Sequence, residues 1–123
     1  MLKLTHYPIA IAQAAQKVVE LDYQLAKLKE QITIFEGQAD LTVAQDQTLK
    51  NDAQRKAYRF ELLQANQEYQ KVQEQFVRLT AEKANSVAHL EYIRNQFSVA
   101  KLEARLIIAQ QISGLEAREL VGF

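Results

Sequence analysis

The chain has 123 residues, with fifteen basic and fifteen acidic side chains and no cysteine. This length suits a single domain spanning residues 1–123, and the balanced charge gives no net attraction to nucleic acid or to anionic lipid. The lack of cysteine excludes disulfides, thiolate metal sites and cysteine nucleophiles, and it agrees with a cytoplasmic location. No apolar run approaches the roughly 20 residues of a membrane span, so we expect no transmembrane segment.

The first predicted element is a helix from about residue 8 to residue 45. The only proline, Pro8, suits the first turn of a helix, where its missing N–H costs nothing. Apolar residues then recur at alternating steps of three and four: Ile11, Ala14, Val18, Leu21, Leu25, Leu28, Ile32, Phe35 and Ala39. A repeat that averages about 3.5 residues keeps one seam facing a partner helix, which is the coiled-coil pattern.

Two positions compete for the end of this helix. Gly37 could end it in the left-handed conformation, with Asp40 capping a second helix. The polar stretch at about residues 46–54 contains Asn51 and Asp52, which also favour turns and caps. A turn in this stretch lets two apolar seams face each other, and Gly37 inside the first helix then costs only about 1 kcal/mol. We therefore expect a polar tip at residues 46–54.

The second predicted helix runs from about residue 55 to residue 112. Its seam is formed by Leu62, Ala65, Tyr69, Val72, Phe76, Leu79, Leu90, Ile93, Phe97, Ala100, Ala104 and Ile107. Lys83 and Ser86 replace apolar residues in this seam, so a bend at residues 80–86 is the alternative to a straight helix. The tail at residues 113–123 is predicted to be a short final helix or a frayed end.

These elements predict an all-α fold. We expect a long antiparallel helical hairpin of the coiled-coil type that self-associates into a helical bundle, and the bend at residues 80–86 would instead produce a three-helix bundle. The first helix is too short to cover the whole second helix. The part of the seam left for self-association comprises Leu90, Ile93, Phe97, Ala100, Ala104 and Ile107. A homodimer would bury these side chains.

The sequence contains no recognisable catalytic or metal-binding arrangement. His6 and His89 are the only histidines, and neither has a metal-binding partner at helical spacing. The three serines lack the context of a nucleophile, and no glycine-rich loop could hold a phosphate. We therefore expect no cofactor, no metal and no enzymatic activity.

Basic residues gather near the predicted tip, beside Tyr58 and Phe60; they are Lys50, Arg55, Lys56 and Arg59. Cations interleaved with aromatic rings can bind a nucleic-acid backbone and stack on bases. Asp46, Asp52 and Glu61 weaken the local positive charge, so contact with a protein partner is the favoured interpretation.

The favoured function is that of a non-catalytic structural or protein-interaction module that self-associates and binds an unidentified protein partner. One alternative is nucleic-acid binding through the tip. The other is peripheral attachment to a membrane or granule surface. Surface helices of that kind prefer lysine and arginine on their polar face, whereas glutamine dominates here.

Overall fold

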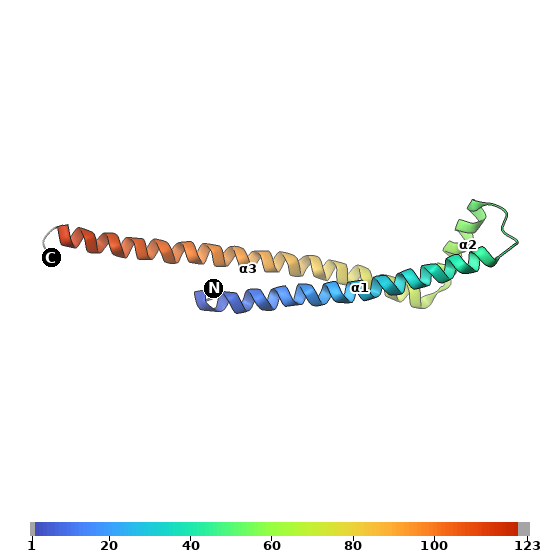
Figure 1. Ribbon diagram of the computed structural model, residues 1–123, viewed down its shortest axis with the longest axis horizontal. Coiled ribbons are helices and arrows are strands. Elements are labelled where there is room, and N and C mark those ends of the chain that lie inside the picture. Colours follow the sequence, from blue (N-terminus) through green and yellow to red (C-terminus); the bar gives the residue numbers. More distant parts are fainter. Residues whose placement is uncertain (1, 121–123) are drawn as a thin grey trace. The chain divides into compact units, whose positions relative to one another are not determined.

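The computed structural model describes residues 2–120, with side chains described for residues 2–115. A 3₁₀ turn at Leu4–His6 leads into helix α1 (Tyr7–Gln45), which is followed by α2 (Asp52–Ala65) and α3 (Gln67–Leu120) (Figure 1). The described residues contain no strand, so the predicted all-α fold is confirmed.

Helix α1 continues through Gly37 and ends at Gln45, which excludes the turn that we considered at Gly37. Residues 46–51 form the connection to α2. Within it, Asp46 Oδ1 accepts hydrogen bonds from the backbone N–H of Thr48 at 2.9 Å and from its hydroxyl at 2.6 Å. Such short-range bonds satisfy backbone donors outside regular structure. The connection therefore lies within the predicted tip.

Helix α2 begins with a capping arrangement around Asn51. The Asn51 Oδ1 atom accepts from the backbone N–H of Gln54 at 2.9 Å, and Gln54 Oε1 accepts from the backbone N–H of Lys50 at 2.7 Å. These reciprocal bonds satisfy two donors near the N-terminus of the helix. They determine the residue at which α2 begins.

The prediction of one uninterrupted helix from residue 55 to 112 is wrong at Asn66. This residue has extended backbone angles (φ −83°, ψ 100°), and its N–H donates to the Leu63 carbonyl at 3.3 Å. Its Oδ1 atom accepts from the backbone N–H of Tyr69 at 3.1 Å and so caps α3. A side-chain cap stabilises the start of a helix by about 1 kcal/mol. This contribution partly offsets the backbone hydrogen bonds that are lost where the helix is interrupted.

The C-terminal part of the second helix also differs from the prediction. Helix α3 passes through residues 80–86 without interruption, so the alternative of a bend there is wrong. It continues beyond residue 112 as far as Leu120. The last three residues of the predicted tail, 121–123, lie outside the described part of the chain.

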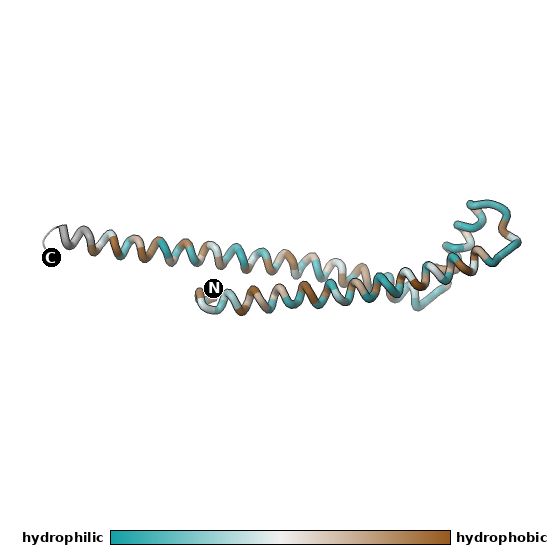
Figure 2. Tube along the Cα trace, in the orientation of Figure 1, coloured by the Kyte–Doolittle hydropathy of each residue, from teal (hydrophilic) through white to brown (hydrophobic). Residues whose placement is uncertain are grey.

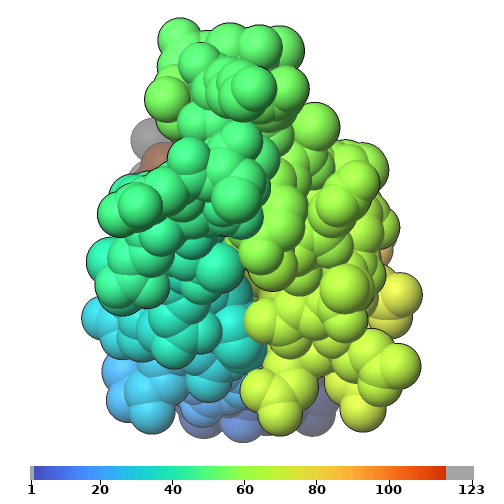
Figure 3. Space-filling model, turned by 90° about the vertical axis from the view of Figure 1, so that its right-hand side faces the viewer, coloured from blue at the N-terminus to red at the C-terminus, as the bar shows by residue number. Residues whose placement is uncertain are grey.

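The chain divides into two compact units, one formed by Val18–Asn85 and the other by Met1–Lys17 together with Ser86–Phe123. We call them the tip unit and the terminal unit. In the tip unit, Figure 3 shows α1 (cyan to green) against α2 and the beginning of α3 (green to yellow). The length alone predicts a single domain and does not reveal this division into two compact units.

The tip unit is an antiparallel hairpin with two buried apolar clusters. One is formed by Leu21, Leu28 and Leu79, and the other by Ala39, Leu63 and Tyr69. The first cluster packs the middle of α1 on the N-terminal part of α3, and the second joins the C-terminal part of α1 to the end of α2 and the beginning of α3. The Phe35 ring meets the Tyr69 ring edge to face, with 6.1 Å between centroids. Seam-to-seam packing of this kind is what the sequence predicts.

The terminal unit is centred on Tyr7, the first residue of α1. Its side chain is fully buried and stacks on Phe97 of α3, with ring centroids 5.3 Å apart and planes 20° apart. Leu90 and Ile93 of α3 are also buried in this unit. The Tyr7 hydroxyl is buried and has no hydrogen-bond partner among the described residues. An unpaired buried hydroxyl is costly, so the aromatic ring must supply the stabilisation at this position.

The Tyr7→Phe substitution should therefore leave the protein as stable or raise its free energy of unfolding by about 1 kcal/mol, because it removes only the unpaired hydroxyl. Tyr7→Ala should cost about 3 kcal/mol, because it also removes the stacked ring. Urea unfolding at one fixed protein concentration measures both variants. A clear loss of stability in Tyr7→Phe would show that the hydroxyl has a partner.

Gly37 offers a second test of the fold. A Cβ atom built at this position meets no atom within 4 Å, and the residue lies inside α1. Gly37→Ala should therefore stabilise the protein by about 0.5–1 kcal/mol, because alanine loses less backbone entropy in a helix. Thermal unfolding followed by circular dichroism is the measurement. A lower melting temperature would indicate that residue 37 belongs to a turn.

Candidate interaction surfaces

Helix α3 extends well beyond its contact with the beginning of α1. Tyr7 stacks on Phe97, whereas α3 continues to Leu120, 23 residues further. At 1.5 Å per residue this extension is about 34 Å long. Only residues 2–6 precede α1 in the described chain, and they cannot cover such a length as a helix.

The six residues predicted for self-association fall into two groups. Leu90 and Ile93 are buried in the terminal unit, and Phe97 is half-buried beneath Tyr7. Ala100 and Ala104 are half-buried, and Ile107 is 54% exposed. Leu90, Ile93 and Phe97 are thus packed within the chain. From Ala100 through Ala104 to Ile107 the side chains of this seam become more exposed to solvent.

Large apolar side chains are exposed along the rest of α3. They are Val99, Leu102, Leu106, Ile107, Ile108, Ile112 and Leu115. Residues 106–115 contain no charged side chain at all. Figure 2 shows the corresponding brown bands on α3, which contrast with the hydrophilic connection between α1 and α2. Contiguous exposed apolar surface with few charges is typical of an interaction site.

The predicted basic cluster at the tip is partly neutralised by carboxylates. The Arg55 Nη1 atom lies 2.8 Å from Asp52 Oδ1 within α2, and Arg59 Nε donates to Asp40 Oδ1 of α1 at 2.6 Å. Among the described residues, Lys50 and Lys56 make no ion pair. Two of the four predicted cations therefore already face acidic side chains.

Arg59 joins α2 to α1 at two points. Besides Asp40, its Nη2 atom lies 3.8 Å from Glu36 Oε2. The hydrogen bond to Asp40 raises the pKa of Arg59 above its ordinary value, and the charges of Asp40 and Glu36 act in the same direction. Glu36 also accepts from the Tyr69 hydroxyl at 3.2 Å, and the Gln73 side chain donates to that hydroxyl at 2.6 Å. This network holds the ends of three helices together.

This network was not predicted, because Arg59 was assigned to the exposed basic cluster. The position of the turn could have indicated that Arg59 lies beside acidic residues of the first helix. A hairpin whose connection spans residues 46–51 places residue 59 level with about residue 38, between Glu36 and Asp40. The predicted seam position of Tyr69 is confirmed, because its side chain is buried. Its hydroxyl in addition donates to Glu36 at the edge of the seam.

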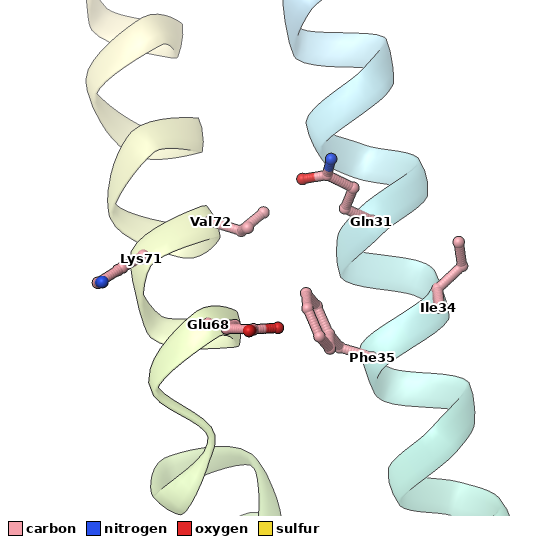
Figure 4. Close-up of a pocket in the computed structure, with 6 residues that line it drawn as sticks. All are labelled: Gln31, Ile34, Phe35, Glu68, Lys71 and Val72. Atoms are coloured by element: carbon pink, nitrogen blue, oxygen red, sulfur yellow. The ribbon is translucent and has the colours of Figure 1, made fainter.

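A shallow groove of about 410 Å³ lies between α1 and α3 in the tip unit. Figure 4 shows Phe35, Glu68 and Val72 directed toward the space between the helices, whereas Lys71 and Ile34 point away from it. The groove has walls from two helices only. Small-molecule sites usually enclose most of the ligand and place several polar groups around it. This groove is open and lacks such an arrangement.

The described residues include no group of three histidine or acidic side chains that could hold a metal ion. His6 and His89 are both exposed. Within the same part of the chain, none of the helices combines the length and the apolar character needed to cross a membrane. Comparison with models of protein families, with curated proteins and with solved structures finds no match.

The contacts of Arg59 predict a difference between two arginines of the same helix. Arg59→Ala should lower the free energy of unfolding by about 1 kcal/mol, because it removes contacts between helices and leaves two carboxylates facing each other. Arg55→Ala should cost about 0.3 kcal/mol, since its ion pair lies within one helix and at the surface. Urea unfolding compares them, and equal effects would contradict a bridging role for Arg59.

Asp46 provides a test of the connection. The hydrogen bonds from the Thr48 hydroxyl and backbone lower the pKa of Asp46 below its ordinary value. A lowered pKa stabilises the fold above the unfolded pKa, about 3.9, and this stabilisation is lost as the pH falls through the folded pKa. Thr48→Val removes only the hydroxyl bond, so the pKa of Asp46 should rise part of the way toward its ordinary value.

Side-chain NMR titration of Asp46 measures this change. Thr42→Val is the matched control, because the Thr42 hydroxyl donates to the Gln38 carbonyl within α1 at 3.0 Å. An unchanged Asp46 pKa in Thr48→Val would show that the hydroxyl bond does not form in solution.

Proposed function

We propose that this protein is a non-catalytic structural or protein-interaction module that self-associates through the C-terminal half of α3. The observation that carries the proposal is the exposed apolar surface of α3 beyond Phe97. A surface helix of a folded protein normally packs its apolar face on the core and leaves its polar face to water. Here apolar side chains remain exposed after the chain has folded, so a further partner is needed to cover them.

A rough energy comparison supports association that is reversible. Leu102, Leu106, Ile107, Ile108, Ile112 and Leu115 are each 51–62% exposed. Burying the exposed half of such a side chain contributes about 1 kcal/mol. Burying all twelve such side chains of two copies would contribute at most about 12 kcal/mol, which does not clearly exceed the roughly 4–15 kcal/mol lost on association. The complex should dissociate on dilution.

A homodimer is the simplest assembly that meets this need, because closed two-fold dimers are the commonest oligomers. A cytoplasmic location, suggested by the lack of cysteine, belongs to the same proposal. No observation favours nucleic-acid binding as a second function, since Arg55 and Arg59 at the tip are occupied by carboxylates.

The proposal predicts the solution mass of two matched variants. The native chain should sediment as a dimer or larger assembly at micromolar concentration. Leu102→Lys should shift it toward the monomer by at least about tenfold in the dissociation constant, since a charge would enter the apolar contact. Leu41→Lys on α1 is the control, because Leu41 is equally exposed (59% against 62%).

Analytical ultracentrifugation over a dilution series gives these masses. A native chain that is monomeric at micromolar concentration would contradict the proposal. So would equal weakening of association by Leu41→Lys and Leu102→Lys.

A further inference from the structure

Helix α3 carries a second apolar stripe in the terminal unit, separate from the seam that packs on α1. It consists of Tyr92, Asn95, Val99, Leu102, Leu106 and Ala109, and we call it the outer stripe. These positions follow steps of three and four, and all six side chains are exposed. Tyr92, Val99, Leu102 and Leu106 are between 48% and 62% exposed.

The outer stripe lies on the opposite side of the helix from the buried residues. Val99 follows Phe97 by two residues, which is a rotation of about 200° at 100° per residue. The stripe also begins at Tyr92, before Phe97, where the other face of α3 is already packed on the beginning of α1. The outer stripe therefore does not result from α3 being longer than α1. Covering this face would require a helix other than α1.

We propose that the outer stripe pairs in parallel with the same stripe of a second copy of this chain, as a two-stranded coiled coil. This inference rests on the proposed self-association and identifies the surface used. It differs from the contact predicted from the sequence, whose residues Leu90 and Ile93 are buried within the chain.

Residue types within the stripe favour the parallel arrangement. In heptad terms Tyr92, Val99 and Leu106 occupy a positions, and Asn95, Leu102 and Ala109 occupy d positions. The central pair, Val99 at a and Leu102 at d, has the residue types that favour two parallel strands. Asn95 then meets Asn95 of the second copy, and an amide can both donate to and accept from an identical amide. Asn95 stands at a d position, whereas the asparagine known to set register stands at an a position; its contribution here is the mutual hydrogen bond of the two amides.

The flanking charges agree with the same arrangement. In a parallel pair, the e and g positions bring together Glu91 with Gln96, Ser98 with Glu103, and Arg105 with Gln110. No like charges meet. In the antiparallel register that places Leu102 opposite Leu106, Glu103 would face Glu103 and Arg105 would face Arg105.

A shift of that antiparallel pair by one heptad avoids the repulsion but creates another cost. Asn95 would then lie opposite Leu106, and its amide would be buried without a partner, at about 1–3 kcal/mol. The parallel pair is thus the arrangement without an electrostatic or hydrogen-bonding penalty. Lipid is a poorer partner, because surface-bound helices carry lysine and arginine beside their apolar face, and the six flanking positions contain one base and two acids.

Single-cysteine cross-linking tests this arrangement, because the natural chain has no cysteine. Tyr92→Cys and Ala109→Cys place a thiol at each end of the outer stripe. These positions are 17 residues apart, about 26 Å along the helix, whereas a disulfide needs Cα atoms within about 7 Å. Arg94→Cys is the control, since Arg94 is exposed on the same helix but outside the stripe.

The parallel pair predicts that each stripe variant, under mild oxidation at micromolar concentration, forms a disulfide with itself. The yield should be roughly tenfold above that of Arg94→Cys, because the contact raises the effective thiol concentration. A mixture of the two variants should give almost no mixed product. The mass of each reduced variant is measured in parallel by ultracentrifugation.

Two results would overturn the inference while leaving self-association intact. One is cross-linking only in the mixture, which indicates an antiparallel pair. The other is an oligomeric mass with equal yields at all three cysteines, which places the contact elsewhere. Monomeric mass for every reduced variant and for the native chain would instead overturn the proposed function itself.

Discussion

The stacking of Tyr7 on Phe97 sets the constraint on which the rest of the structure depends. It fixes which part of α3 the beginning of α1 can cover, and α3 continues 23 residues beyond that point. Leu90 and Ile93 are therefore buried within the chain, while Leu102, Leu106 and the isoleucines that follow stay exposed. An exposed apolar surface of this kind is typical of an interaction site. The proposed self-association would cover this surface.

At the other end of the hairpin, polar contacts determine where the chain turns. Asn51 begins α2 and Asn66 begins α3, each through a side-chain cap. Arg59 then ties α2 to Glu36 and Asp40 of α1. These ion pairs are only about half-buried, so they add specificity more than stability. The apolar clusters around Leu28 and Tyr69 supply the larger stabilising contribution.

Much of this architecture could be predicted from the apolar repeat. The repeat identified α1, the polar tip and the seam that contains Tyr69, because burial at helical spacing is a strong signal. The break at Asn66 could not be found this way, since one capping residue changes the backbone without changing the seam. The outer stripe was missed for a different reason. Tyr92, Val99 and Leu102 have the same spacing as the main seam, and only the observed burial of Ile93 separates the two faces.

Hydrogen–deuterium exchange across a dilution series tests the central claim most directly. If α3 is covered by a second copy, amides of residues 98–115 should be protected at high protein concentration and lose that protection on dilution. Amides around Leu21 and Leu28, buried within the chain, should keep theirs at both concentrations. Exchange of residues 98–115 that is fast and independent of concentration would contradict self-association through α3.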